Sequence, residues 1–166
     1  DRIVEIRTVG YPGVAINESR RPDGATREID VSGMYILPGL VDMHVHTGGA
    51  GKAPQAEYTH KLWMGNGITT ARGVGFGPMM WSLEQKALSE ANDIVAPRMF
   101  VYARPGEAWD RGPVTTPEMA REWVRWAADV DVDGARIDGL KLTSYPPAIM
   151  EALIDERSEE HTSELQ

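Results

Sequence analysis

The sequence predicts an α/β protein with a parallel sheet, and two features support that prediction. Between residues 36 and 156 of the 166-residue chain, short apolar or β-branched runs alternate four times with segments of helical period. The runs are apolar throughout, as expected for strands that are covered on both faces. Four strand–helix units in succession give a parallel sheet joined by crossover helices.

The expected elements alternate along the chain. Strands are expected at residues 36–46, 67–71, 98–103 and 137–143, and helices at residues 53–66, 78–92, 115–130 and 147–156. Pro38-Gly39 is a turn signal where the first strand begins. The run Thr115-Thr-Pro-Glu118 is a helix start, with Thr at the cap, Pro in the first turn and Glu completing a capping box. Trp123 and Trp126 share the apolar stripe of that helix, which predicts core packing rather than a ligand platform.

Residues 1–35 have a different pattern. Short apolar runs at residues 2–9, 14–16 and 26–31 are separated by turns that contain Pro12-Gly13 and Pro22-Asp-Gly24. This spacing predicts a small antiparallel β element ahead of the parallel sheet.

The composition is that of an ordinary globular protein, with 42% hydrophobic and 25% charged residues. The formal net charge is -8, and the acidic residues are scattered. The sequence has no basic patch, which argues against a nucleic-acid surface, and no run approaches the roughly 20 apolar residues that span a bilayer. Cys is absent, so a bound metal would need His, carboxylate or a modified Lys.

The first expected strand ends in His44-Val45-His46. Strand side chains alternate between faces, so both imidazoles point to one side, together with Leu40 and Asp42. Two neutral imidazoles at one strand end form half of a divalent metal site. The alternative for an isolated pair is simple packing or hydrogen bonding, and the residues before the pair decide between the two interpretations.

The string Leu37-Pro-Gly-Leu-Val-Asp-Met-His-Val-His46 resembles the first barrel strand of the metal-dependent amidohydrolase superfamily. The lead-in at residues 29–39 is similar as well. The resemblance implies a (β/α)8 TIM-type barrel, with the two histidines binding a divalent metal at its mouth, and a small β-sandwich built from both chain termini. Residues 1–35 would be the N-terminal part of the sandwich. Residues 36–156 would be the first half of the barrel, because eight units need about 250 residues.

A further ligand candidate lies in the fourth expected strand, where Lys141 stands between Leu140 and Leu142. In a strand covered on both faces, the leucines would face the helices and Lys141 the barrel interior. Burial disfavours an ammonium and leaves a neutral amine, which can capture carbon dioxide as a carbamate. The run Gly139-Leu-Lys-Leu142 resembles the strand that supplies a carboxylated lysine in many binuclear amidohydrolases. The alternative is a lysine whose ammonium reaches solvent at the strand end.

The resemblance therefore implies two divalent ions, zinc by expectation, bridged by carboxylated Lys141 and bound by His44 and His46. Such a site would activate water to hydrolyse a C–N bond. The lead-in, the run Gly67-Ile-Thr-Thr and the lysine strand most resemble the imidazolonepropionase-like and prolidase-like group, which implies a cyclic amide or dipeptide substrate. In that family two further His and a catalytic Asp come from strands five, six and eight. This chain alone is expected to be inactive.

Loops after the strands carry the remaining candidates, because barrel active sites lie at the carboxyl ends of strands. In the third loop, Arg104 and Glu107 are candidate substrate contacts; solvated loop charge is the alternative for both, and for Arg111. Arg72 follows the second strand, where the family often has Arg-Asp. This chain has Arg72-Gly73, so the position is left without an assigned role.

The two ends of the chain carry separate expectations. The chain starts without Met inside an expected strand, so we expect a piece of a longer protein. Residues 157–166 match the translation of a common sequencing adapter and are expected to be an artefact, which removes His161 from the candidate ligands. His60, on the first helix, is expected to be a packed or surface histidine. A half-barrel has unpaired first and fourth strands, which predicts aggregation or a homo-oligomer.

Two other functions fit the same sequence. A mononuclear deaminase of the same fold would act on an exocyclic amine and would need no lysine bridge. A catalytically dead relative would keep the fold and serve as a binding protein, although the presence of His44, His46 and Lys141 argues against it.

Overall fold

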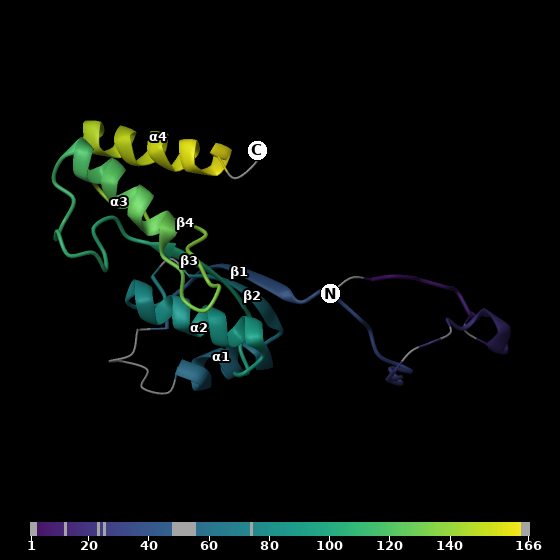
Figure 1. Cartoon of the computed structure of the whole chain (residues 1–166). Coiled ribbons are helices and arrows are strands. Elements are labelled where there is room, and N and C mark those ends of the chain that lie inside the picture. The colour runs from purple at the N-terminus through teal and green to yellow at the C-terminus, as the bar shows by residue number, and fades with distance from the viewer. Residues whose placement is uncertain are drawn as a thin grey trace. The chain divides into compact units, whose positions relative to one another are not determined.

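The structure, a computed structural model, describes residues 3–11, 13–22, 24, 26–47, 56–73 and 75–163 (Figure 1). The chain divides into two compact units, Asp1–Leu37 and Pro38–Gln166. None of the helices in these described ranges is long and apolar enough to cross a membrane.

The second unit contains the predicted alternation of strands and helices. The strands are β1 (Leu40–Val45), β2 (Ile68–Gly73), β3 (Arg98–Ala103) and β4 (Gly139–Leu140), and the helices are α1 (Ala56–Gly65), α2 (Met79–Ala91), α3 (Pro117–Asp129) and α4 (Pro147–Ser163). The sheet order is β1-β2-β3-β4, and every neighbouring pair is parallel. The prediction of a parallel α/β fold is confirmed, and the topology is consistent with the start of a TIM-like domain. Residues 53–55 of the expected first helix lie outside the described residues.

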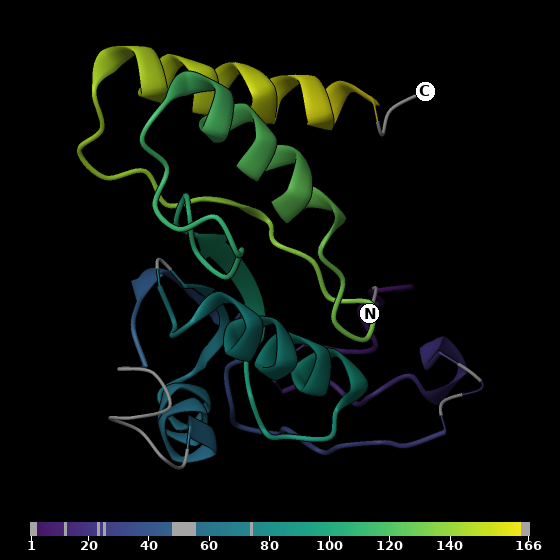
Figure 2. The ribbon, with the colours of Figure 1, turned by 60° about the vertical axis from the view of Figure 1, so that its left-hand side comes forward.

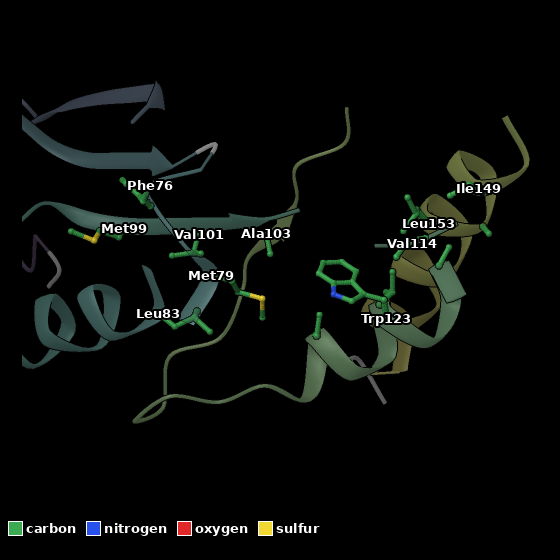
Figure 3. Packing of buried hydrophobic residues seen from close by; sticks show 14 of the residues in the cluster. Phe76, Met79, Leu83, Met99, Val101, Ala103, Val114, Trp123, Ile149 and Leu153 are labelled. Atoms are coloured by element: carbon green, nitrogen blue, oxygen red, sulfur yellow. The ribbon is translucent and has the colours of Figure 1, made fainter. Parts of the chain in front are cut away.

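One face of the sheet is covered by helices. On β3, every second residue, Met99, Val101 and Ala103, is only 1–2% exposed. Figure 3 shows these side chains beside Met79 and Leu83 of α2, and they form one apolar cluster with residues of α3 and α4. In addition, α2 packs against β3 and α1 against β2 (Figure 2).

The other face of the sheet, which we call the open face, is not covered by these helices. Phe100, between two buried residues of β3, is 39% exposed. Tyr102 lies on the same face, and the guanidinium of Arg72 is 4.1 Å from the centroid of its ring. Leu40 is 60% exposed on the outer strand β1.

The ends of the helices differ in detail from the sequence-based expectation. Helix α3 is capped by Thr116, whose side chain accepts the N–H of Met119 at 3.2 Å, rather than by Thr115. Helices α3 and α4 lie side by side (Figures 1 and 2), and the buried carboxylate of Glu156 accepts from Nη2 of Arg125 at 3.1 Å. Helix α4 continues past Glu156, but the origin of residues 157–166 stays a prediction because a polar extension can propagate a helix whatever its source.

The first unit lacks the strands that its sequence pattern predicts. Within the described part of Asp1–Leu37, the only helix or strand is the short 3₁₀ helix η1 (Glu18–Arg20). The strands expected at residues 2–9, 14–16 and 26–31 are therefore wrong for residues 3–9, 14–16 and 26–31, and residue 2 lies outside the described residues. Large apolar side chains of these segments are exposed, and Val4 is 95% exposed. A single isolated hairpin is marginal in water without a second layer to pack against, and the β-sandwich part is not shown.

Candidate metal site at the carboxyl ends of the strands

His44 and His46 lie at the carboxyl end of β1, on either side of Val45. Val45 is buried, whereas both histidines are exposed. Their Nε2 atoms are 3.1 Å apart and their ring centroids 5.1 Å apart. The two imidazoles thus converge beyond the end of the strand, as the alternation of strand side chains predicts.

A backbone carbonyl fixes the orientation of the His46 ring. Nδ1 of His46 lies 3.0 Å from the carbonyl oxygen of Gly75. That oxygen can only accept, so Nδ1 carries the proton and Nε2 keeps a lone pair, which is the form that binds a metal. A hydrogen bond of this kind orients most metal-binding histidines. On the other histidine, the backbone N–H of His44 donates to Oδ1 of Asp42 at 3.0 Å.

The separation of the two nitrogens fits a tetrahedral zinc ion. Two nitrogens with Zn–N distances of about 2.0–2.1 Å lie about 3.3–3.4 Å apart at tetrahedral angles. The observed 3.1 Å is close to this value, and it is also the distance of a hydrogen bond between the two rings. In the described residues, no group of three or more His, Cys, Asp or Glu side chains could hold a metal ion. The pair can therefore supply two ligands, and other donors would have to complete the site.

Lys141 directly follows β4 and continues its hydrogen bonding. Its backbone N–H donates to the carbonyl oxygen of Ala103 at 2.7 Å. Leu140 pairs in register with Ala103, which is buried on the helix-covered face, so Lys141 points to the open face. The side chain of Lys141 is half-buried, and no hydrogen-bond or ion-pair partner of its ammonium is found among the described residues.

Lys141 and the two histidines share a face of the sheet but lie at opposite edges of it. Val45 pairs with Gly73, which is buried on the helix-covered face, so the histidines beside Val45 point to the open face. Strands β1 and β4 are the outer strands of the sheet. They are three spacings of about 4.8 Å apart along it. In a closed barrel, inward side chains of such strands approach across the interior, so a shared metal site requires closure.

The loop after β2 holds the end of β1 in place. The carbonyl oxygens of Gly75 and Phe76 accept hydrogen bonds from Nδ1 of His46 and Oγ1 of Thr47. Phe76 is buried, and a Cβ at Gly73 would lie 1.9 Å from its ring. This contact explains why position 73 holds a residue without a Cβ. Sequence reasoning did not identify Gly75 or Phe76, and the signal was two closely spaced glycines directly after a strand.

The charged residues of the loop after β3 have different partners in the structure. Both carboxylate oxygens of Glu107 accept backbone N–H groups, from Met79 at 3.0 Å and from Arg104 at 3.3 Å. Glu107 thereby joins the start of α2 to the end of β3, and its carboxylate is engaged within the protein. The guanidinium of Arg111 pairs with the carboxylate of Glu122 on α3.

Arg104 lies close to the histidine pair. A Cβ built on Gly75 would be 2.9 Å from Nη2 of Arg104 and 3.8 Å from Nδ1 of His46. The guanidinium and the imidazole therefore share one side of Gly75. Gly75 has φ +94°, so its backbone and the space that Arg104 occupies both require glycine.

His60 lies inside the fold. It is 0% exposed, and neither of its ring nitrogens has a hydrogen-bond partner among the residues that the structure describes. Burial lowers the pKa of His60, against the opposing charge of Glu57, and so favours the neutral ring. Its ring centroid lies 5.6 Å from that of Trp63, which is 6.1 Å from that of Phe76. Of the two expected environments, packed or at the surface, His60 has the packed one.

Proteins of known structure share this fold. A Xaa-Pro dipeptidase with methionine bound in its active site is similar over 81% of this chain and 46% of its own, with a TM-score of 0.56 and 19% identity. An amidohydrolase is similar over 87% of this chain and 46% of its own, with a TM-score of 0.60 and 18% identity. An adenine deaminase from Methanoculleus marisnigri is 51% identical over 45 residues, which are 27% of this chain and 8% of that protein. No protein-family model matches the chain.

The structural similarities confirm the prediction of an amidohydrolase-type fold. The chain spans less than half the length of both solved structures and a small part of the deaminase. At 18–19% identity the structures establish the fold. The match to the deaminase is confined to 45 residues of this chain.

Proposed function

We propose that the protein to which this chain belongs is a metal-dependent hydrolase that cleaves the C–N bond of a cyclic amide or a dipeptide-type amide. The convergence of His44 and His46, with their Nε2 atoms 3.1 Å apart, is the observation that supports this most directly. The hydrogen bond from His46 to Gly75 supports it further, because it leaves Nε2 free to bind a metal.

Each candidate residue has a role in this proposal. A divalent ion, zinc by the chemistry of the imidazole donors, would polarise the substrate carbonyl and activate a water. His44 and His46 would hold it through Nε2. Lys141, carboxylated by carbon dioxide, would bridge it to a second ion. Arg104 would contact the substrate, while Glu107 fixes the backbone of the loop that carries Arg104.

Titration of the chain with Co²⁺, a spectroscopic substitute for zinc, tests the histidine pair. We expect binding that falls at least about 100-fold in a double His44→Ala, His46→Ala variant, which is more than the loss of an orienting hydrogen bond produces. His161→Ala is the matched control and should bind Co²⁺ unchanged. Equal Co²⁺ affinity in the double variant and the control would show that the pair is not a metal site.

A mononuclear deaminase is the second candidate, and the sequence match to an adenine deaminase favours it. The number of bound ions separates the two functions, because only the binuclear hydrolase uses a carboxylated lysine. After incubation with ¹³C-bicarbonate, we expect a carbamate signal in the ¹³C NMR spectrum that is lost in Lys141→Ala. One ion per chain and no carbamate would favour the deaminase.

A further inference from the structure

A guanidinium that pairs with no carboxylate or aromatic ring of the described residues lies beside the proposed metal ligands. Nη2 of Arg104 is 2.9 Å from the position of a Gly75 Cβ, and Nδ1 of His46 is 3.8 Å from the same point. The Arg104 side chain is exposed, and no carboxylate or aromatic ring among the described residues engages its guanidinium. A guanidinium in this position is available to a ligand that approaches the histidine pair.

Other arginines near the carboxyl ends of the strands contact acidic or aromatic side chains of the same chain. Arg111 pairs with Glu122, and the guanidinium of Arg72 lies 4.1 Å from the centroid of the Tyr102 ring. The chain has 25 acidic and 17 basic residues, so a shortage of carboxylates does not explain why none of the described ones pairs with Arg104. The difference lies in the local structure of its loop.

The carboxylate of Glu107 fixes the backbone of Arg104 and does not pair with its guanidinium. Its carboxylate accepts the N–H groups of Arg104 and Met79 at 3.3 and 3.0 Å, and its own N–H donates to the Arg104 carbonyl at 3.0 Å. Nε1 of Trp123, a core residue, donates to the Glu107 carbonyl at 3.1 Å. The loop is thus anchored to the core at its backbone, while the Arg104 side chain projects from an ordered base.

We propose that Arg104 binds a carboxylate of the substrate, so that the enzyme acts on amides that carry a carboxylate near the scissile bond. This inference rests on the proposed function and narrows its substrate class. A guanidinium presents paired N–H donors that match the two oxygens of a carboxylate. Arg104 lies on the Nδ1 side of His46, and the metal would lie on the Nε2 side. A dipeptide or an N-acyl amino acid could reach from the metal, with its amide carbonyl, to Arg104, with its carboxylate.

N-acetylglycine and the neutral N-acetylglycinamide test this assignment, because they differ only in the carboxylate. Their affinities for the 166-residue chain are measured by NMR titration, with and without added Zn²⁺. We expect N-acetylglycine to bind at least about tenfold more tightly, as a charge-assisted pair provides. Arg104→Met should abolish this preference and Arg104→Lys should keep part of it. Arg111→Met, a matched loss of one arginine from the same loop, should leave it unchanged.

Three outcomes overturn the inference. The first is that the chain does not prefer N-acetylglycine, and the second is that the Arg104→Met variant keeps the preference. The third is that acetate binds as tightly as N-acetylglycine, which would identify a general anion site. The zinc affinity of the same samples judges the proposed function separately. A chain that binds zinc but binds N-acetylglycine no more tightly than N-acetylglycinamide contradicts only the role of Arg104. A chain that fails to bind zinc contradicts the metal site.

Discussion

Strand β3 allows the two faces of the sheet to be compared residue by residue. Met99 and Val101 are each 2% exposed and pack under the helices, whereas Phe100 between them is 39% exposed on the open face. All three are apolar, so composition alone does not distinguish them. What distinguishes them is the direction in which each side chain leaves the strand.

Residues that stabilise the fold and residues that could bind a ligand lie on different faces of the sheet. The helix-covered face holds the apolar cluster, and the open face holds Arg72, Lys141 and the histidine pair. Because neighbouring residues of a strand point to opposite faces, a substitution on one face need not disturb the other. The comparison therefore predicts that unfolding free energy and ligand binding respond to different residues of the same strand.

The largest expected effect is on stability and comes from the covered face. Met99→Ala should lower the free energy of unfolding by about 2–5 kcal/mol, because it leaves a cavity in the cluster. Phe100→Ala removes a larger side chain but should lower it by less than about 1 kcal/mol, because that side chain is already partly solvated. Urea denaturation followed by tryptophan fluorescence measures both. Equal losses for the two variants would mean that the open face is covered in solution.

Elements with a local period could be predicted from the sequence. The expected strand at residues 98–103 coincides with β3, and the expected helix at residues 78–92 contains α2. These patterns depend on side chains a few residues apart, which the sequence displays directly. The strands expected in residues 1–35 failed for the opposite reason, because a strand depends on a partner that no local pattern supplies.

Lys86 shows what local reasoning missed. It lies on the buried side of α2 with Met79 and Leu83, and it is 8% exposed. Its Nζ donates to both carboxylate oxygens of Asp138 and to the Arg136 carbonyl, each at 2.9 Å. A charged residue on an apolar stripe predicts a buried partner, but the identity of that partner, 52 residues away, required the fold.

In the candidate site, too, some features could be predicted from a local pattern and others required the fold. Strand alternation predicted that His44 and His46 would converge, because the two residues are neighbours on one face. The acceptor of the His46 ring proton, Gly75, is 29 residues away and could not be identified from a local pattern. A contact between Lys141 and the histidines depends on closure of the barrel, which is a property of more strands than the four in this chain.

A smaller effect should follow from a substitution in the loop after β2. Gly75→Ala would strain the backbone at φ +94°, even though the Arg104 side chain can move away from the new Cβ, and we expect the loop to shift together with the carbonyl that holds His46. We expect the zinc affinity to fall about 10–100-fold, the usual consequence of losing an orienting hydrogen bond. Isothermal titration calorimetry with zinc measures this change.

Gly112→Ala is the matched control for Gly75→Ala. Gly112 also has a positive φ, +75°, but its Cβ would meet nothing within 4 Å. Both variants should lose stability by about 1–2 kcal/mol from backbone strain, whereas only Gly75→Ala should weaken zinc binding. A similar loss of zinc affinity in both would trace the effect to general destabilisation.

The smallest expected effect is a pH dependence that comes from His60. Burial lowers the pKa of His60 from 6.5, so the unfolded chain takes up this proton at a higher pH than the folded chain does. The free energy of unfolding should therefore fall as the pH drops below 6.5 and level off below the lowered pKa. His60→Phe removes the group and should flatten this part of the curve, measured by urea denaturation with a chelator present. Parallel curves for the two proteins would show that the charge of His60 is the same in the folded and unfolded chain. The neighbouring rings of His60, Trp63 and Phe76 would then be accessible to water.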